Sequence, residues 1–125
     1  MEEVYQGQSL EILVSIEDDA GNPINIATDA NAVCQMILFD SKDNQIERFK
    51  YPSAAGYKTI ALESPTTGEY LIRVDSSKTA NGSEGPAYLE IKCALTNDDF
   101  EESKFIGVTR VPDLFHLIRN QIKKA

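Results

Sequence analysis

The amino-acid sequence predicts an all-β protein, an antiparallel β-sandwich of seven to nine short strands followed by one helix. Three observations lead to this fold class. Apolar and polar residues alternate in many short runs, turn-forming residues separate these runs every eight to twelve positions, and the hydrophobic period changes only after residue 110. With 125 residues, the chain has the length of one ordinary domain.

Residues 64–75, SPTTGEYLIRVD, contain the best-marked turn and strand of the sequence. A Pro-Thr-Thr-Gly turn leads into a strand in which Tyr70, Ile72 and Val74 share one face. A tyrosine at such a position often packs its ring under a sheet corner and bonds its hydroxyl to nearby backbone. We therefore expect Tyr70 to be a packing residue rather than a ligand contact.

The N-terminal segment contains the longest regular alternation. Apolar residues recur at every second position from Leu10 to Ile16, and the turn sequence DDAGNP follows at residues 18–23. Gly7 interrupts the strand pattern before this run, which predicts a bulge or a switch from one sheet to the other.

Residues 32–40, AVCQMILFD, are apolar on both faces. This pattern indicates a central strand whose outer face is covered by the C-terminal segment or by a neighbouring subunit. Residues 76–88 form the longest predicted loop, and long loops are where binding or disorder concentrates. Further strands are predicted at residues 46–51, 57–63, 87–95 and 103–110.

The final segment, VPDLFHLIRNQIKKA, predicts an amphipathic helix. Apolar side chains recur at helical spacing, and Pro112 and Asp113 suit a helix start. We expect a sandwich at residues 1–110 and a helix at residues 111–125. The helix either completes the core of the sandwich or docks on another protein through its apolar face. The candidate partner-binding residues are Leu114, Phe115, Leu117, Ile118 and Ile122.

The chain is acidic, with a formal net charge of -8 at pH 7. Such a surface repels phosphate backbones and anionic lipid, so we expect neither nucleic acid nor membrane among its partners. The N-terminus, MEEVYQGQ, shows no signal-peptide pattern, and no apolar run reaches the ~18 residues that span a bilayer. We expect synthesis in the cytoplasm.

Cys34 and Cys93 both lie among apolar residues in predicted strands. One interpretation is a disulfide between two sheets, and the other is a pair of buried free thiols that pack as small hydrophobic groups. We favour the free thiols, because a chain without a secretion signal is expected in a reducing compartment.

No set of residues predicts a catalytic site. The one histidine, His116, has no partner for a triad or a three-ligand zinc site. The acidic clusters at residues 17–19 and 98–102 lack the alternating spacing of a calcium loop and are typical of solvated turns. The chain also has no Trp to line the groove of a glycosidase. We expect no enzymatic activity, no bound metal and no cofactor.

Two segments carry a resemblance to a known class of protein. In QGQSLEILVSIEDDAGNPINI a long strand runs into a D-x-x-G-N-P-I turn, and the strand TGEYLIRVD follows later. Over residues 6–75 the chain resembles the small immunoglobulin-like structural domains of tailed-phage virions, such as the N-terminal domain of baseplate upper proteins, head decoration proteins and head fibres. The resemblance implies an immunoglobulin-like antiparallel β-sandwich and a non-enzymatic virion component of the capsid, tail or baseplate.

Two functional hypotheses follow. The first is a structural virion protein that binds other virion proteins as part of a homo- or hetero-oligomer. The second is a carbohydrate-binding or adhesive module, whose contacts would come from the loop at residues 76–88 and from Tyr51, Tyr57 or Tyr88. An immunoglobulin-like module of a bacterial surface protein is a weaker third hypothesis.

Overall fold

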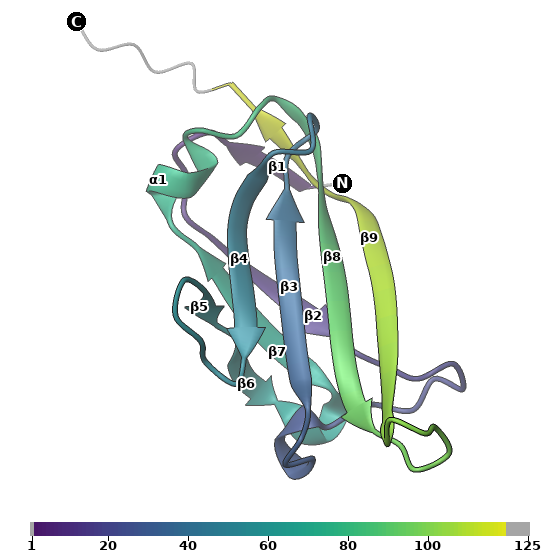
Figure 1. Ribbon diagram of the computed structural model, residues 1–125. Coiled ribbons are helices and arrows are strands. Elements are labelled where there is room, and N and C mark those ends of the chain that lie inside the picture. The colour runs from purple at the N-terminus through teal and green to yellow at the C-terminus, as the bar shows by residue number, and fades with distance from the viewer. Residues whose placement is uncertain (1, 120–125) are drawn as a thin grey trace, which may run out of the picture.

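The computed structural model describes residues 2–119, which form two β-sheets packed face to face (Figure 1). One sheet has six strands in the order β1-β9-β8-β3-β4-β5, and the other has three in the order β2-β7-β6. The all-β prediction is confirmed. The elements are β1 (Glu2–Tyr5), β2 (Leu10–Ser15), η1 (Ile26–Thr28), β3 (Val33–Phe39), β4 (Gln45–Tyr51), β5 (Lys58–Thr59), β6 (Ala61–Ser64), η2 (Pro65–Thr67), β7 (Glu69–Val74), α1 (Ser76–Thr79), β8 (Gly85–Thr96) and β9 (Lys104–Ile118).

Strands β2 and β7 show how alternation in the sequence produces the core. Every second residue of β2 from Leu10 onward is buried, and the residues between them are exposed. The antiparallel partner β7 follows the same rule, with Ile12 of β2 opposite the buried Ile72. Removing each such aliphatic side chain from water contributes about 1.5–3 kcal/mol to folding, so this pattern fixes the register of the sheet.

Tyr70 is fully buried at the start of β7 and links this strand to the segment that follows β2. Its hydroxyl donates a 2.6 Å hydrogen bond to the carbonyl of Ile24 and accepts a 3.0 Å bond from the amide of Ile26. Burial raises the pKa of the phenol above its ordinary value. The prediction of a corner-packing tyrosine is confirmed.

Strand β3 is central in the six-stranded sheet, between β8 and β4, as its two-sided apolar pattern predicted. Its inward residues Cys34, Met36 and Leu38 are fully buried. Val33, on the other face, is 38% exposed. The C-terminal segment lies in the plane of the sheet as part of β9, so its described residues do not form the expected cover over the outer face of β3.

The two cysteines are cross-strand neighbours in one sheet, Cys34 on β3 and Cys93 on β8. Their Sγ atoms lie 2.8 Å apart, and both thiols are free and buried. The alternative of a disulfide between two sheets is therefore wrong, and the prediction of buried free thiols is confirmed. The hydrogen bond to Cys93, together with burial, raises the pKa of Cys34 well above its ordinary range.

The predicted C-terminal helix is wrong, because residues 111–118 continue β9 across the expected boundary at residue 110. The register of β8 and β9 shifts at a bulge opposite Tyr88, and Pro112 and Asp113 lie in this bulge. Asp113 has a positive φ of 51°. Beyond the bulge, Phe115 and Leu117 are buried and alternate with the partly buried Leu114, His116 and Ile118. The backbone amides and carbonyls of this segment form hydrogen bonds with β8 on one side and with β1 on the other. This pairing makes the segment a strand, in which side chains alternate between the two faces.

The chain passes from the larger to the smaller sheet at both edges of the larger sheet. Strand β1 pairs in parallel with the C-terminal end of β9, and the turn at Gly7, with φ 86°, leads into β2 of the smaller sheet. The predicted switch at Gly7 is confirmed. On the other side a single residue, Ile60, separates β5 of the larger sheet from β6 of the smaller one.

Candidate functional site

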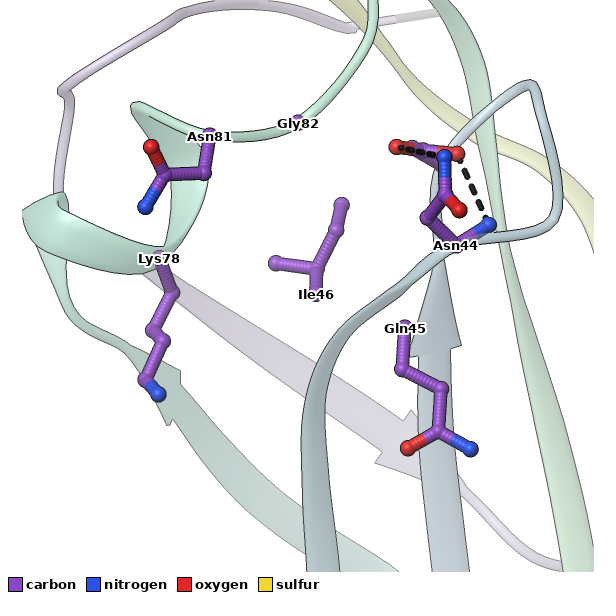
Figure 2. Close-up of a pocket in the computed structure, with 7 residues that line it drawn as sticks. Asn44, Gln45, Ile46, Lys78, Asn81 and Gly82 are labelled. Atoms are coloured by element: carbon purple, nitrogen blue, oxygen red, sulfur yellow. Dashed lines mark hydrogen bonds between the residues drawn. The ribbon is translucent and has the colours of Figure 1, made fainter.

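A shallow polar hollow of about 190 Å³ lies between α1 and the β3–β4 turn (Figure 2). Lys78 and Asn81 form one wall, Asn44 and Gln45 form the other, and Ile46 lies between them. This volume is below the roughly 300–1,000 Å³ of typical ligand pockets. The hollow therefore suits a few water molecules better than a substrate.

Asp40, at the rim of this hollow, is the most connected polar side chain of the region. Its buried carboxylate accepts hydrogen bonds from the backbone amides of Lys42 (2.9 Å), Asn44 (3.0 Å) and Ser83 (3.0 Å). Burial alone would raise the pKa of Asp40, but these three donors outweigh it and hold the pKa below its ordinary value. Because its acceptor sites are used by the protein itself, we assign Asp40 a structural role.

The same local design occurs at Asp18, in the turn that the sequence marked as an acidic cluster. The carboxylate of Asp18 accepts from the amides of Ala20 and Asn22, and the amide of Asp18 donates to the carbonyl of Asn22. Asp40 and Asn44 repeat this arrangement in the β3–β4 turn. The spacing D-x-x-x-N was a usable sequence signal for both turns, and the sequence reasoning missed it.

We predict that Asp40→Asn lowers the free energy of unfolding by about 1–3 kcal/mol at pH 7, because an amide cannot accept all three backbone hydrogen bonds. The folded-state pKa of Asp40 lies below the unfolded value of 3.8, so its contribution is complete above pH 3.8 and is lost as pH falls through the folded value. The difference between the two proteins should therefore shrink in acid. Urea unfolding at pH 7 and below pH 3.8 measures it.

Asp18→Asn is the matched control, since it removes an equivalent carboxylate from an exposed turn. Its loss at pH 7 should be smaller, because exposed amides recover hydrogen bonds from water. An Asp40→Asn deficit that is equally large at both pH values would contradict the assigned role of the ionised carboxylate.

The tyrosines of the carbohydrate hypothesis have little free ring surface. Tyr88 stacks on Phe39 with ring centroids 4.9 Å apart, and the Arg110 guanidinium lies 3.8 Å from the centre of its ring. The hydroxyl of Tyr88 donates a 2.6 Å hydrogen bond to Asp43, which raises the pKa of the phenol. Sugar stacking needs an open aromatic face, and Tyr88 does not present one.

The other two tyrosines are also engaged. The Arg48 guanidinium lies 4.7 Å from the ring centre of Tyr57, and the Lys50 ammonium lies 5.2 Å from it. Tyr51 is partly buried and packs against the core. The predicted loop at residues 76–88 is also more ordered than expected, since it begins with the short helix α1 and ends inside β8.

The other candidate groups lie apart from one another. His116 is on β9, with Glu3 and Pro86 as its neighbours in register. Within residues 2–119, no three side chains of His, Cys, Asp or Glu gather closely enough to hold a metal ion. In the same range, no helix has the length and apolar character needed to cross a membrane.

An apolar stripe lies on the outer face of the six-stranded sheet, near the residue at which β9 begins. Val33, Ala94 and Ile106 are register neighbours on β3, β8 and β9, and Val108 lies beside them. Ile106 is 43% exposed and Val108 is 69% exposed. We call these four residues the outer stripe. Contiguous exposed apolar residues are the kind of surface at which proteins associate.

The stripe ends at an open sheet edge. Strand β9 pairs with β1 over Phe115–Ile118, but its first half, residues 104–111, pairs only with β8 in the part of the chain that the structure describes. An unpaired edge strand presents a row of amides and carbonyls to any strand that can align with it. The outer stripe and this edge together form the candidate binding surface.

Four of the five predicted partner-binding residues lie at the other end of β9. Phe115 and Leu117 are buried in the core of the chain itself, and Leu114 packs against that core. Ile118 is partly buried, and Ile122 lies outside the described residues. Of the two roles considered for this segment, completing the core is the one that the structure shows for Phe115 and Leu117.

Comparisons of the chain with known protein families, with curated proteins and with solved structures found no match.

Proposed function

We propose that this domain is a non-enzymatic structural protein of a tailed-phage virion, and that it binds other virion proteins through the outer stripe. The observation that carries the proposal is the apolar row of Val33, Ala94 and Ile106 at one end of the larger sheet, in which Val33 and Ile106 are exposed and Ala94 is half-buried. The phage assignment is supported by the resemblance of residues 6–75 to virion domains. Its place would be in the capsid, tail or baseplate, as one subunit among several.

The strand order supports an immunoglobulin-like architecture of the variable type. In that fold, one sheet carries strands C, F and G with the added C′ and C″, and the other carries B, E and D. The order β9-β8-β3-β4-β5 fits the first sheet, and β2-β7-β6 fits the second. The chain departs from antibody domains at Tyr70, which lies on the strand equivalent to E, and at Cys34 and Cys93, which share one sheet.

The physical argument for a partner rests on the cost of exposed apolar surface. Single exposed apolar side chains are common on monomers, but aligned ones beside an open strand edge favour association. The segment 32–40 predicted a cover over the outer face of β3, by the C-terminal segment or by a neighbouring subunit. Since the C-terminal segment lies within the sheet, a neighbouring subunit is the cover that we propose.

The test is the composition of virus particles from the source of this sequence. We expect mass spectrometry of purified particles to find the protein in a constant ratio to the capsid protein, and electron microscopy to place it on the particle. Val33→Glu should give particles without the protein, because the contact would bury an unpaired carboxylate. Thr66→Glu adds the same charge to an exposed turn of the smaller sheet and should leave incorporation unchanged.

Absence of the protein from purified particles would overturn the proposal. Reproducible binding to a glycan array, abolished by Tyr57→Ala but not by Val33→Glu, would replace it with the carbohydrate-binding alternative.

A further inference from the structure

Two of the open strand edges, that of β2 and that of the first half of β9, lie on the same side of the two sheets. Ile60 alone links β5 to β6, so it closes one side and leaves β2 and the β9 edge together on the opposite side (Figure 1). Within residues 2–119, β2 pairs with β7 alone. The fold type that the strand order suggests would place a further strand beside β2, and the described chain has none there.

The hydrogen bonds within the chain determine which residues of each edge strand have their backbone amide and carbonyl directed to the open edge. The amide of Asn97 donates to the carbonyl of Ser103, so odd-numbered residues of β9 from 103 to 111 direct their backbone toward β8. The even-numbered residues 104–110 direct theirs to the open edge. The amide of Ile16 donates to the carbonyl of Gly68, so residues 11, 13, 15 and 17 direct theirs away from β7.

We propose that the β2 edge of one chain pairs with the β9 edge of a second copy of the same chain. This inference rests on the proposed role as a binding module and names a partner for its open edge. The antiparallel pairs would be Glu11 with Arg110, Leu13 with Val108, Ser15 with Ile106 and Glu17 with Lys104.

In this register the paired side chains are complementary in both charge and apolar character. Each end of the pairing joins an acidic to a basic side chain, and the centre joins Leu13 (54% exposed) to Val108 (69% exposed). A shift by two residues in one direction places Glu11 opposite Val108. A shift in the other direction places it opposite Pro112, which has no amide to donate.

The inner faces also agree. The inward residues of β2, from Leu10 to Ile16, would meet the inward residues of β9, and Phe105, which is 45% exposed in the single chain, would be covered. The pairing would end at Val111, next to the bulge. From Phe115 onward the edge of β9 is occupied by β1 of the same chain, so the second copy and β1 would not compete for space.

Two such contacts, each between β2 of one copy and β9 of the other, can form at once if a single twofold axis relates the copies. Strand β1 runs parallel to β9, and the turn at Gly7 reverses the chain into β2, so β2 and β9 run in opposite directions. A twofold axis parallel to the strands, on the open side, brings β9 of each copy beside β2 of the other. The larger sheet of one copy then continues into the smaller sheet of the other, and the dimer is closed.

The test is analytical ultracentrifugation of the purified full chain over a range of concentrations. We expect a dimer. Lys104→Glu should raise its dissociation constant about tenfold or more, because it places a second carboxylate opposite Glu17 at each of the two contacts in the dimer. Glu17→Lys should do the same, and the double variant Glu17→Lys with Lys104→Glu should restore the affinity of the unmodified chain. Neither side chain takes part in a hydrogen bond or ion pair within the described residues.

Val108→Pro is a second and independent variant. The Val108 amide directs its hydrogen to the open edge, so proline there removes a donor from the dimer contact and none from the β8–β9 ladder. We expect a folded monomer by circular dichroism and ultracentrifugation. A chain that stays monomeric at about 1 mM, or a dimer indifferent to Lys104→Glu and to the double exchange, would overturn the inference.

The two proposals fail separately. A monomeric chain that is still incorporated into particles, and loses incorporation with Val33→Glu, would remove the second copy and keep the virion role. A dimer with the predicted charge dependence that is absent from every particle would keep the edge contact and remove the virion role.

Discussion

Replacing Phe115 by alanine should lower the free energy of unfolding by about 3–5 kcal/mol, because it removes a fully buried ring between the two sheets. Total stabilities of small domains are about 5–15 kcal/mol, so the variant should be close to unfolding at room temperature. Urea unfolding followed by circular dichroism measures the change.

Val108→Ala on the same strand is the matched control for Phe115→Ala. Val108 is 69% exposed, so its truncation should change the stability of the chain by less than about 0.5 kcal/mol, measured at a concentration low enough to keep it monomeric. Truncation after Val111 extends the test, since it removes Phe115, Leu117 and the partner segment of β1, and should abolish the fold. A folded truncated chain would show that the end of β9 is dispensable for the core.

Gly68→Ala should destabilise the protein by about 2–4 kcal/mol, which combines a left-handed backbone with a steric clash. Gly68 has φ 73°, and a methyl group there would lie 2.6 Å from the carbonyl oxygen of Ile16. The amide of Ile16 is bonded to Gly68 and its carbonyl is bonded to Ile24, so the clashing atom cannot move without breaking the β2–β7 pairing. Thermal and urea unfolding both measure the loss.

Gly21→Ala separates the two contributions. Gly21 also has a left-handed backbone, at φ 84°, but a methyl group there would meet no atom within 4 Å. Its cost should be about 1–2 kcal/mol, from the backbone conformation alone. Equal losses at Gly68 and Gly21 would show that the contact with Ile16 contributes nothing.

The strands that alternate cleanly were predictable from the sequence because their burial is local in origin. In β2 and β7, each buried residue is followed by an exposed or partly buried one, so the period of two can be read without knowing the partner strand. Tyr70 was predictable for a similar reason, since its Gly-Glu-Tyr entry places the ring at the corner. The central place of β3 followed from apolar residues on both of its faces.

The end of β9 could not be predicted in this way. In Leu114–Ile118 a central histidine has two apolar residues on each side, and this run satisfies a period of two and a period of about four equally well. Pro112 is as acceptable in the first turn of a helix as in an edge strand or bulge. The choice between strand and helix depends on the pairing with β1, which lies about one hundred residues earlier in the chain. The residues near Leu114–Ile118 therefore carry no sequence signal for it.

The candidate binding surface could not be predicted from the sequence for a related reason. Whether Ile106 and Val108 are covered depends on which strands lie beside β9, and that order follows from the whole topology. Phe105, Ile106 and Val108 alone suggest an ordinary core strand. Ile106 and Val108 are exposed because they lie on the outer face of the larger sheet, away from the smaller sheet, and Phe105 on the inner face is exposed because the beginning of β9 is an open edge.

The parallel pairing of β1 with the end of β9 also determines when this protein can fold during its synthesis. Glu2–Tyr5 leave the ribosome long before their partners Phe115–Ile118. Until then Val4, which is fully buried in the finished fold, has no strand to pair with, and both sheets lack their final stabilising contacts. The fold therefore cannot be completed before the end of β9 has been synthesised, and until then β1 of the nascent chain stays unpaired.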